Sequence, residues 1–207
     1  MELVDRLIER YGYNEPIIIE EIFSAWNEYS KTRVYQLLNN YVSDGVLQRY
    51  DKGIYYVPTI TKLGTPSHLG FRQVVEKKYI QSGEKIYGYY GGLSLLNGLG
   101  LTTQMPNTLE VVTSKESTRV REIKIRSSKL FLRRARVQVT KDNVCVLMLL
   151  EAFNVVNGVF DYDALVRVRE FVKQNNISLN DVFSYAKVFP GKAIKNLLIN
   201  GVENVFA

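Results

Sequence analysis

The chain contains 207 residues, of which 46% are hydrophobic and 23% are charged, and its formal net charge is +6. This length accommodates one large domain or two small ones, and the apolar content suffices for a buried core. No apolar run reaches the roughly 18 residues of a membrane span, and the charged N-terminal stretch lacks the pattern of a secretory signal. The single cysteine excludes an internal disulfide. Together these features favour a cytoplasmic protein without a membrane partner.

The charge is distributed unevenly along the chain. Residues 1–60 contain six Lys/Arg and nine Asp/Glu, a net of −3, whereas residues 61–207 contain the remaining 21 and 12, a net of +9. A positive excess of this size suits a polyanionic partner, and it lies outside the N-terminal segment.

Residues 1–58 predict a winged helix-turn-helix domain. The expected elements are helices at Glu2–Tyr11, at Ile18–Trp26 and after Ser30, then strands at Val46–Tyr50 and Ile54–Val57. Ser30 suits the N-cap of the third helix, and Gly45 suits its end. In such folds the second helix of the helix-turn-helix pair enters the DNA major groove.

Residues 59–70 are rich in Pro, Gly and Thr and predict a connector, which leaves residues 71–207 as a second domain. Its expected helices are Gly70–Gln81, Gly92–Gly98, Val144–Val155, Asp161–Gln174, Leu179–Lys187 and Pro190–Leu198. Its expected strands are Leu109–Thr113, Glu122–Arg126, Lys129–Leu132 and Ala135–Val139. The predicted fold class is therefore α+β, with the winged head followed by a mixed domain that has a basic sheet and C-terminal helices.

The third helix offers a candidate DNA-reading face. Its apolar stripe consists of Val34, Leu37, Leu38, Tyr41 and Val42. The residues left to face outward, beside the capping Ser30, are Lys31, Thr32, Arg33, Tyr35, Gln36 and Asn39. Arg33 suits a bidentate contact with guanine, and Gln36 or Asn39 suits adenine. Lys31 suits a phosphate.

Two residues of the predicted hairpin, Arg49 and Lys52, suit contacts with the DNA backbone or minor groove. The same pattern of outward residues on the third helix also describes an ordinary polar helix face, and winged folds also serve as protein-interaction modules.

A basic segment lies in the second domain, where residues 115–141 contain ten Lys/Arg against two Glu. The candidate phosphate-contacting residues in it are Arg119, Arg121, Lys124, Arg126, Arg133, Arg134 and Arg136. Such a basic sheet would raise DNA affinity by releasing counterions. The alternatives are an RNA, an acidic protein partner, or a solvated strand surface whose charges protect a sheet edge.

Residues for catalysis or metal binding are sparse. His68 is the single histidine, so no Cys/His cluster for zinc is present. The glycines between Gly88 and Gly100 lack the Gly-Lys-Ser/Thr ending of a phosphate-binding loop. Glu122-Ile123-Lys124, with Glu110 upstream, matches the Glu-x-Lys spacing of metal-dependent nucleases.

We therefore expect no catalytic residue, no metal site and no cofactor. A degenerate metal-dependent nuclease with a DNA-targeting winged-helix head is the alternative function, and a protein-binding adaptor is a third.

The central segment resembles a known family. The residues that carry the resemblance are Tyr89, Gly92, Leu93, Leu96, Asn97, Gly100, Leu101, Thr102, Thr103, Gln104 and Pro106. The hairpin pattern Gly45-Val46-Leu47 followed by Lys52-Gly53-Ile54-Tyr55 supports it. Over about residues 17–155 the chain is similar to the AbiEi-type antitoxins of abortive-infection (type IV) toxin–antitoxin systems.

The resemblance implies a sequence-specific transcriptional repressor that binds operator DNA, with inverted repeats as the expected site, and autoregulates its toxin–antitoxin operon in phage defence. It also implies that the second domain opposes a nucleotidyltransferase-like toxin without forming a stable complex with it. Family members carry positive charge on the C-terminal domain, as this chain does. The chain departs from the family in its acidic N-terminal segment.

Overall fold

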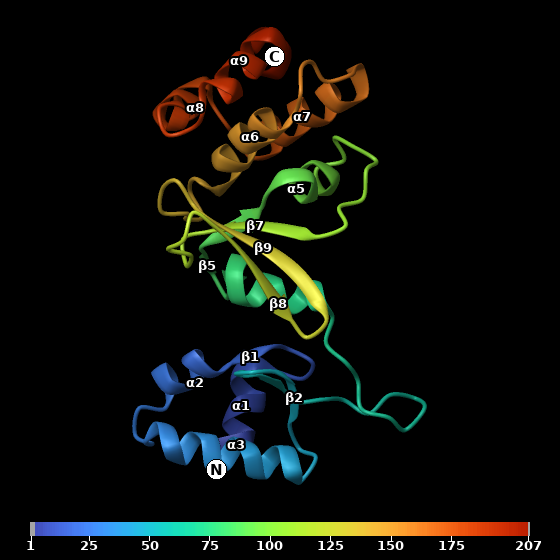
Figure 1. The fold of residues 1–207 in the computed structure, drawn as a ribbon, viewed down its shortest axis with the longest axis vertical. Helices are drawn as coiled ribbons and strands as arrows, with labels where there is room; N and C mark the ends of the chain where they lie inside the picture. Colours follow the sequence, from blue (N-terminus) through green and yellow to red (C-terminus); the bar gives the residue numbers. More distant parts are fainter. Residues whose placement is uncertain (1–2, 207) are drawn as a thin grey trace. The chain divides into compact units, whose positions relative to one another are not determined.

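The computed structural model describes residues 3–206, which form a mixed α+β architecture with several sheets (Figure 1). These residues divide into two compact units. Unit 1 extends to Lys78 and includes Ile125–Ser127, and unit 2 contains the rest. The stretch 59–70, for which the sequence predicts a connector, is thus part of unit 1.

Unit 1 combines α-helices with a small antiparallel sheet. Its elements are α1 (Leu3–Tyr11), β1 (Ile17–Ile18), α2 (Ile19–Ala25), α3 (Lys31–Ser43), β2 (Gln48–Asp51), β3 (Ile54–Tyr56) and α4 (Phe71–Val75), which continues into the π-helical segment η1 (Glu76–Ile80). The strand order is β1-β3-β2. Glu2, the expected first residue of the first helix, lies outside the described residues.

The strand β1 was not predicted. Ile17 pairs with Tyr55 and Ile18 pairs with Ile54 in antiparallel register. The run of three isoleucines continues without a break into α2, so periodicity alone assigned Ile18 to the helix. Cross-strand pairing with β3 decides its conformation instead.

The core of unit 1 lies between the helices and this sheet. Its buried residues include Leu7 of α1, Ile22 of α2, and Val34 and Leu38 of α3. The other members of the predicted α3 stripe, Leu37, Tyr41 and Val42, are half-buried and pack against it. One face of α3 is therefore committed to the core, as its periodicity predicts.

The predicted ends of α3 are confirmed. The backbone N–H of Arg33 donates to Ser30 Oγ at 3.2 Å, so Ser30 is the N-cap. At the other end Asp44 is the C-cap and Gly45 has a φ of 73°, a left-handed conformation that glycine adopts without strain.

Unit 2 packs five C-terminal helices beside a four-stranded sheet. Its first elements are β4 (Gln81–Ser82), β5 (Lys85–Ile86), β6 (Gly88–Tyr90), α5 (Gly92–Gly98), β7 (Leu109–Thr113), β8 (Val120–Ile125) and β9 (Ser128–Arg134). The helices that follow are α6 (Val144–Val155), α7 (Tyr162–Gln174), α8 (Leu179–Ala186), α9 (Gly191–Ile199) and α10 (Val202–Phe206). The sheet order is β6-β7-β9-β8, with β6 antiparallel and β9 parallel to β7.

Several predicted elements of unit 2 are confirmed to the residue, namely Gly92–Gly98, Leu109–Thr113 and Val144–Val155. The helix expected at Gly70–Gln81 is present but ends as the π-helical segment η1, and the β4–β5 hairpin that follows was not predicted. The strand expected at Ala135–Val139 is wrong. Ala135 N–H still donates to Thr113 O of β7 at 3.0 Å, but the ladder does not continue. The apolar residues that follow pack on the core, and Val139 N–H donates to Ser114 Oγ.

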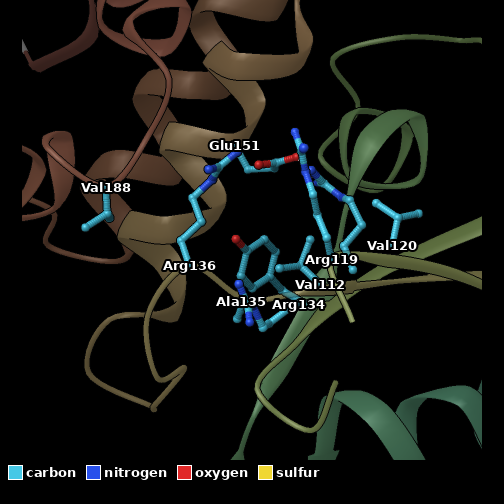
Figure 2. A pocket seen from close by; sticks show the side chains of 10 residues that line it. Val112, Arg119, Val120, Arg134, Ala135, Arg136, Glu151 and Val188 are labelled. Atoms are coloured by element: carbon cyan, nitrogen blue, oxygen red, sulfur yellow. The ribbon is translucent and has the colours of Figure 1, made fainter. Parts of the chain in front are cut away.

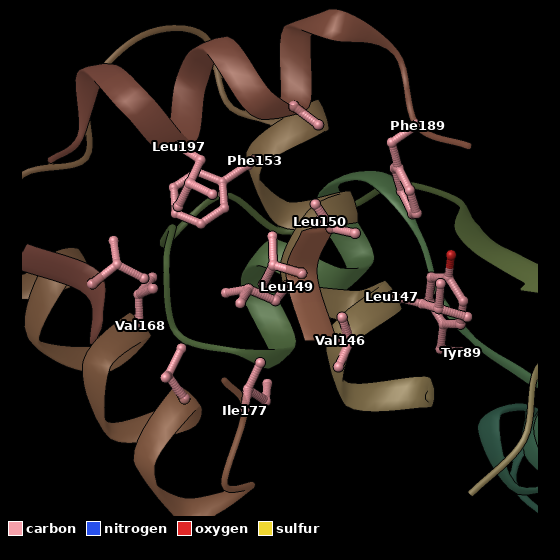
Figure 3. Packing of buried hydrophobic residues seen from close by; sticks show 14 of the residues in the cluster. Tyr89, Val146, Leu147, Leu149, Leu150, Phe153, Val168, Ile177, Phe189 and Leu197 are labelled. Atoms are coloured by element: carbon pink, nitrogen blue, oxygen red, sulfur yellow. The ribbon is translucent and has the colours of Figure 1, made fainter. Parts of the chain in front are cut away.

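The helix α6 is the centre of unit 2. It is apolar on all sides and is covered by neighbouring helices, as expected for a helix without a solvent face. Figure 3 shows Leu149, Leu150 and Phe153 of α6 between Val168, Leu197 and Phe189. The only charged residue on α6 is Glu151, which is also buried.

Replacing Ser30 by Ala is expected to lower the free energy of unfolding of unit 1 by about 1 kcal/mol, because the N-cap acceptor for Arg33 N–H is lost. Trp26 is the single tryptophan and is buried in unit 1, so denaturant unfolding followed by its fluorescence reports on this unit. Ser43→Ala, at the exposed last position of α3, is the control and should shift the midpoint little. An equal loss in both variants would contradict the capping role.

Candidate nucleic-acid interface

The outward face of α3 is polar and accessible. Every residue that the sequence assigns to this face is exposed, together with the capping Ser30: Lys31, Thr32, Arg33, Tyr35, Gln36 and Asn39. Arg33, Gln36 and Asn39 recur every third residue, so their side chains lie along one side of the helix. The structure thus brings together the three predicted base-reading residues.

Contacts with α2 hold two of these side chains. The ring of Tyr35 meets the ring of Phe23 edge-on with centroids 5.6 Å apart, and Lys31 Nζ lies 5.5 Å from the centroid of the Phe23 ring. Aromatic and cation–π contacts of this kind restrict the two side chains without covering them. Tyr35 is still 46% exposed.

The local charge of α3 differs from that of the segment around it. The helix contains Lys31 and Arg33 and no acidic residue, whereas α1 and α2 contain acids such as Asp5, Glu20 and Glu21. Both cations lie in the first turn, where the helix dipole disfavours positive charge by about 0.3–1 kcal/mol each. The net −3 of residues 1–60 therefore does not describe the surface of α3.

The hairpin β2–β3 presents its two predicted cations to solvent. Arg49 is on β2, where its Nε donates to Asp51 O at 3.4 Å, and Lys52 is at the turn beside Gly53. Lys52 N–H donates to Asp51 Oδ1 at 2.7 Å, which fixes the turn backbone while its side chain stays exposed.

The predicted basic residues between Arg119 and Arg136 do not form one strand face. Arg121 and Lys124 are on β8 at positions of opposite parity, so their side chains point to opposite faces of the sheet. Arg126 is at the turn between β8 and β9 with a φ of 52°. Arg119 precedes β8, and Arg136 follows β9 in the segment where the expected strand is absent.

A buried carboxylate anchors the loop that carries Arg119. Glu116 accepts hydrogen bonds from the N–H groups of Ser117 and Thr118, and from Arg121 Nε and Nη2 at 3.1 and 2.7 Å. Burial raises the pKa of Glu116, but the bonds from Thr118 and Arg121 outweigh burial and hold that pKa below its ordinary value. Arg134 reinforces the loop, because its N–H donates to Arg119 O at 3.3 Å.

Beside this loop unit 2 contains a cavity of about 500 Å3. Its lining residues are Tyr89, Val112, Arg119, Val120, Arg133, Arg134, Ala135, Arg136, Glu151 and Val188. Figure 2 shows Arg119 and Arg136 on opposite sides of the cavity, with Glu151 between them at its edge. Four of the seven basic residues that the sequence analysis names between residues 119 and 136 thus converge on one hollow rather than on a flat sheet face.

Arg133 is held in an ion-pair network inside this lining. Its Nη2 pairs with Glu151 Oε1, and its Nε lies 2.6 Å from Glu110 Oε1 without a hydrogen-bonding angle. Although burial opposes it, the two carboxylates raise the pKa of Arg133, which therefore stays charged. Burial also raises the pKa of Tyr89, so its phenol is protonated at neutral pH.

Two glycines leave room for this network. A Cβ on Gly92, which has a φ of +54°, would lie 2.6 Å from Glu110 Oε2, and one on Gly91 would lie 3.0 Å from Arg133 Nη2. This close packing accounts for two of the glycines between Gly88 and Gly100, namely Gly91 and Gly92.

The nuclease-like residues are occupied by other contacts. Glu122 pairs with Lys129 at 3.0 Å, Glu110 contacts Arg133, and β9 lies between the strands that carry Glu110 and Glu122. Among the side chains that the structure describes, no group of three from His, Cys, Asp or Glu is placed to hold a metal ion.

Sequence reasoning did not select Glu151 or Tyr89 as site residues. A detectable signal for Glu151 was its position as the single acid in an otherwise apolar helix, because a buried carboxylate needs a cationic partner. No comparable signal marked Tyr89, which lies in an aromatic-rich stretch of the chain.

No family model and no curated protein matches this chain. Of the helices in the described part of the chain, none has both the length and the apolar character that crossing a membrane requires.

Replacing Glu116 by Gln is expected to lower the free energy of unfolding by about 1–3 kcal/mol at pH 7, because charged hydrogen bonds to Thr118 N–H and Arg121 are weakened. The pKa of Glu116 is lower in the folded chain than in the unfolded chain, so this stabilisation is present above the unfolded pKa and is lost as the pH falls through the folded pKa.

The difference between wild type and Glu116→Gln should therefore shrink towards pH 3 in denaturant unfolding followed by circular dichroism. Glu122→Gln is the control, because its pair with Lys129 is exposed and should contribute less than about 1 kcal/mol. A pH-independent loss in Glu116→Gln would show that its charge is not the cause.

Proposed function

We propose that the protein is a sequence-specific, double-stranded-DNA-binding transcriptional repressor whose α3 reads base edges in the major groove. The observation that carries this proposal is the division of α3 into two faces. Val34 and Leu38 are fully buried, while all six polar residues assigned to the opposite face are exposed. A helix built in this way can dock on a duplex without disturbing its own core.

The order of elements in unit 1 supports a winged helix-turn-helix. Helices α1, α2 and α3 are followed by the β2–β3 hairpin, and β1 completes a three-stranded sheet. Only residues 26–30 separate α2 from α3. At 1.5 Å per residue the 13 residues of α3 span roughly 20 Å, enough to lie along a groove about 12 Å wide.

The residues of this interface have different roles. Arg33 offers a bidentate contact to guanine O6 and N7, and Gln36 or Asn39 offers one to adenine, each contributing about 1–3 kcal/mol of discrimination. Lys31 meets phosphate at the start of α3. Arg49 and Lys52 extend the contact from the hairpin, which serves as the wing.

Unit 2 adds electrostatic affinity through the basic residues that remain exposed, such as Lys124 and Arg134. Arg133 contributes little to this electrostatic affinity for DNA, because Glu110 and Glu151 neutralise its charge.

The biological role rests on the resemblance to AbiEi-type antitoxins. We infer that this cytoplasmic protein represses its own toxin–antitoxin operon through unit 1. Unit 2 would oppose a nucleotidyltransferase-like toxin without a stable complex and without enzymatic activity of its own. Positive charge concentrated after residue 60 agrees with that family pattern.

Arg33→Ala is expected to reduce discrimination between operator and random DNA by about 1–3 kcal/mol, roughly 5- to 150-fold, while non-specific binding changes little. Lys31→Ala should weaken binding to both DNAs alike and reduce the salt slope by about one unit. Fluorescence anisotropy at several salt concentrations measures both effects. Arg10→Ala, an exposed cation on α1, is the charge-matched control. Unchanged selectivity of Arg33→Ala would remove α3 from the reading surface.

Co-expression with a nucleotidyltransferase-like toxin encoded beside this protein is expected to restore growth. Arg33→Ala should restore growth equally well while derepressing an operon reporter, because antitoxicity is assigned to unit 2 and repression to α3. Pull-down of the tagged protein should retain no toxin. Failure to restore growth, or a stoichiometric complex, would refute the antitoxin role while leaving DNA binding intact.

A further inference from the structure

The cavity of unit 2 has a lining of mixed chemistry that DNA binding by α3 does not use. Arg119 and Arg136 lie on opposite sides of it, and Val188 and Val120 lie on the same two sides, so cationic and apolar surface are interspersed (Figure 2). A lining of this kind matches a ligand that carries both anionic groups and apolar surface.

The arginines of the lining are not electrically equivalent. Arg133 forms ion pairs with Glu151 and Glu110, whereas Arg119, Arg134 and Arg136 form no ion pair with any carboxylate whose side chain the structure describes, and Glu151 attracts Arg136 only at longer range. Three guanidinium groups that share one hollow repel one another. Bound anions would relieve that repulsion.

The protein also positions these cations. Glu116 anchors the loop that carries Arg119, and Arg134 Nη1 donates to Ser117 O at 3.3 Å. The guanidinium of Arg136 lies 5.3 Å from the centroid of the Phe189 ring. Side chains held in this way lose less freedom when a ligand binds than freely rotating surface arginines do.

We propose that this cavity binds a nucleoside di- or triphosphate. The phosphates contact Arg119, Arg134 and Arg136, and the base and ribose contact apolar residues of the lining. Guanidinium groups suit phosphate because they donate paired hydrogen bonds in one plane. A cavity of about 500 Å3 is within the range of small-molecule sites, and inorganic phosphate alone would leave most of it empty.

The test is isothermal titration of the full-length protein with ATP, GTP, ADP, AMP, adenosine and inorganic tripolyphosphate. We expect affinity to rise from AMP to ADP to the triphosphates, adenosine not to bind, and tripolyphosphate to bind more weakly than ATP. Absence of binding at millimolar ATP and GTP would overturn the proposal. Equal affinity for ATP and tripolyphosphate would also overturn it, since the apolar residues of the lining would then have no role.

The double variant Arg119→Ala/Arg136→Ala should lose at least tenfold in ATP affinity. The control double variant Lys124→Ala/Lys195→Ala removes the same charge from exposed sites that do not line the cavity, and should keep wild-type affinity. Equal losses in both would assign the binding to general electrostatics and overturn the proposal.

Val120→Glu is a second variant that tests the site without removing an arginine. Val120 is 51% exposed, so the substitution should not disturb folding, and a carboxylate in the lining should weaken ATP binding on the order of tenfold. Unchanged ATP affinity would show that the nucleotide binds elsewhere. Arg33→Ala should leave ATP binding intact, which separates this proposal from DNA binding by α3.

Discussion

The ion pair between Glu151 and Arg133 is the interaction around which unit 2 is organised. Glu151 is 1% exposed on a helix that is otherwise apolar, and leaving a carboxylate there without a partner would be very unfavourable. Arg133 reaches it from the end of β9 and therefore couples the central helix to the sheet. Removing one partner of such a pair typically costs about 3–5 kcal/mol, because the other charge stays buried.

The residues around the Glu151–Arg133 pair are arranged to accommodate it. Glu110 supplies a second carboxylate to Arg133 from the neighbouring strand β7, and Gly91 and Gly92 provide the space that its side chain needs. With Arg133 paired, the remaining arginines of the lining form no ion pair with a described carboxylate. The same network that stabilises the packing of α6 on the sheet thus determines which cations stay available to a ligand.

In unit 1 the charged residues of the candidate site lower stability instead of raising it. Its core residues in α3 are an ordinary apolar stripe, but Lys31 and Arg33 occupy the first turn, where the helix dipole disfavours them. The Ser30 cap offsets part of this cost by satisfying Arg33 N–H. The proposal of DNA binding therefore rests on the exposed face of α3 rather than on the total charge of residues 1–60.

The sequence by itself determined the elements whose signals are local. Ser30 and Gly45 mark the ends of α3, and the mostly apolar run 144–155 forms α6. The helical periodicity of apolar residues in α3 assigned its polar face correctly. Capping and periodicity are readable because they depend on residues a few positions apart. Ile17–Ile18 and Gly88–Tyr90 became strands only because distant strands pair with them, and Ala135–Val139 did not, since its pairing with β7 ends at Ala135.

The cavity likewise was decided only by the tertiary structure. Tyr89, Arg119, Arg136 and Glu151 are dispersed over more than 60 residues of sequence, and the fold of β6, β9 and α6 brings them together. Composition reveals how many arginines the segment 115–141 contains. Which of them are neutralised depends on the positions of Glu110, Glu116 and Glu151 in space, and no local pattern encodes those distances.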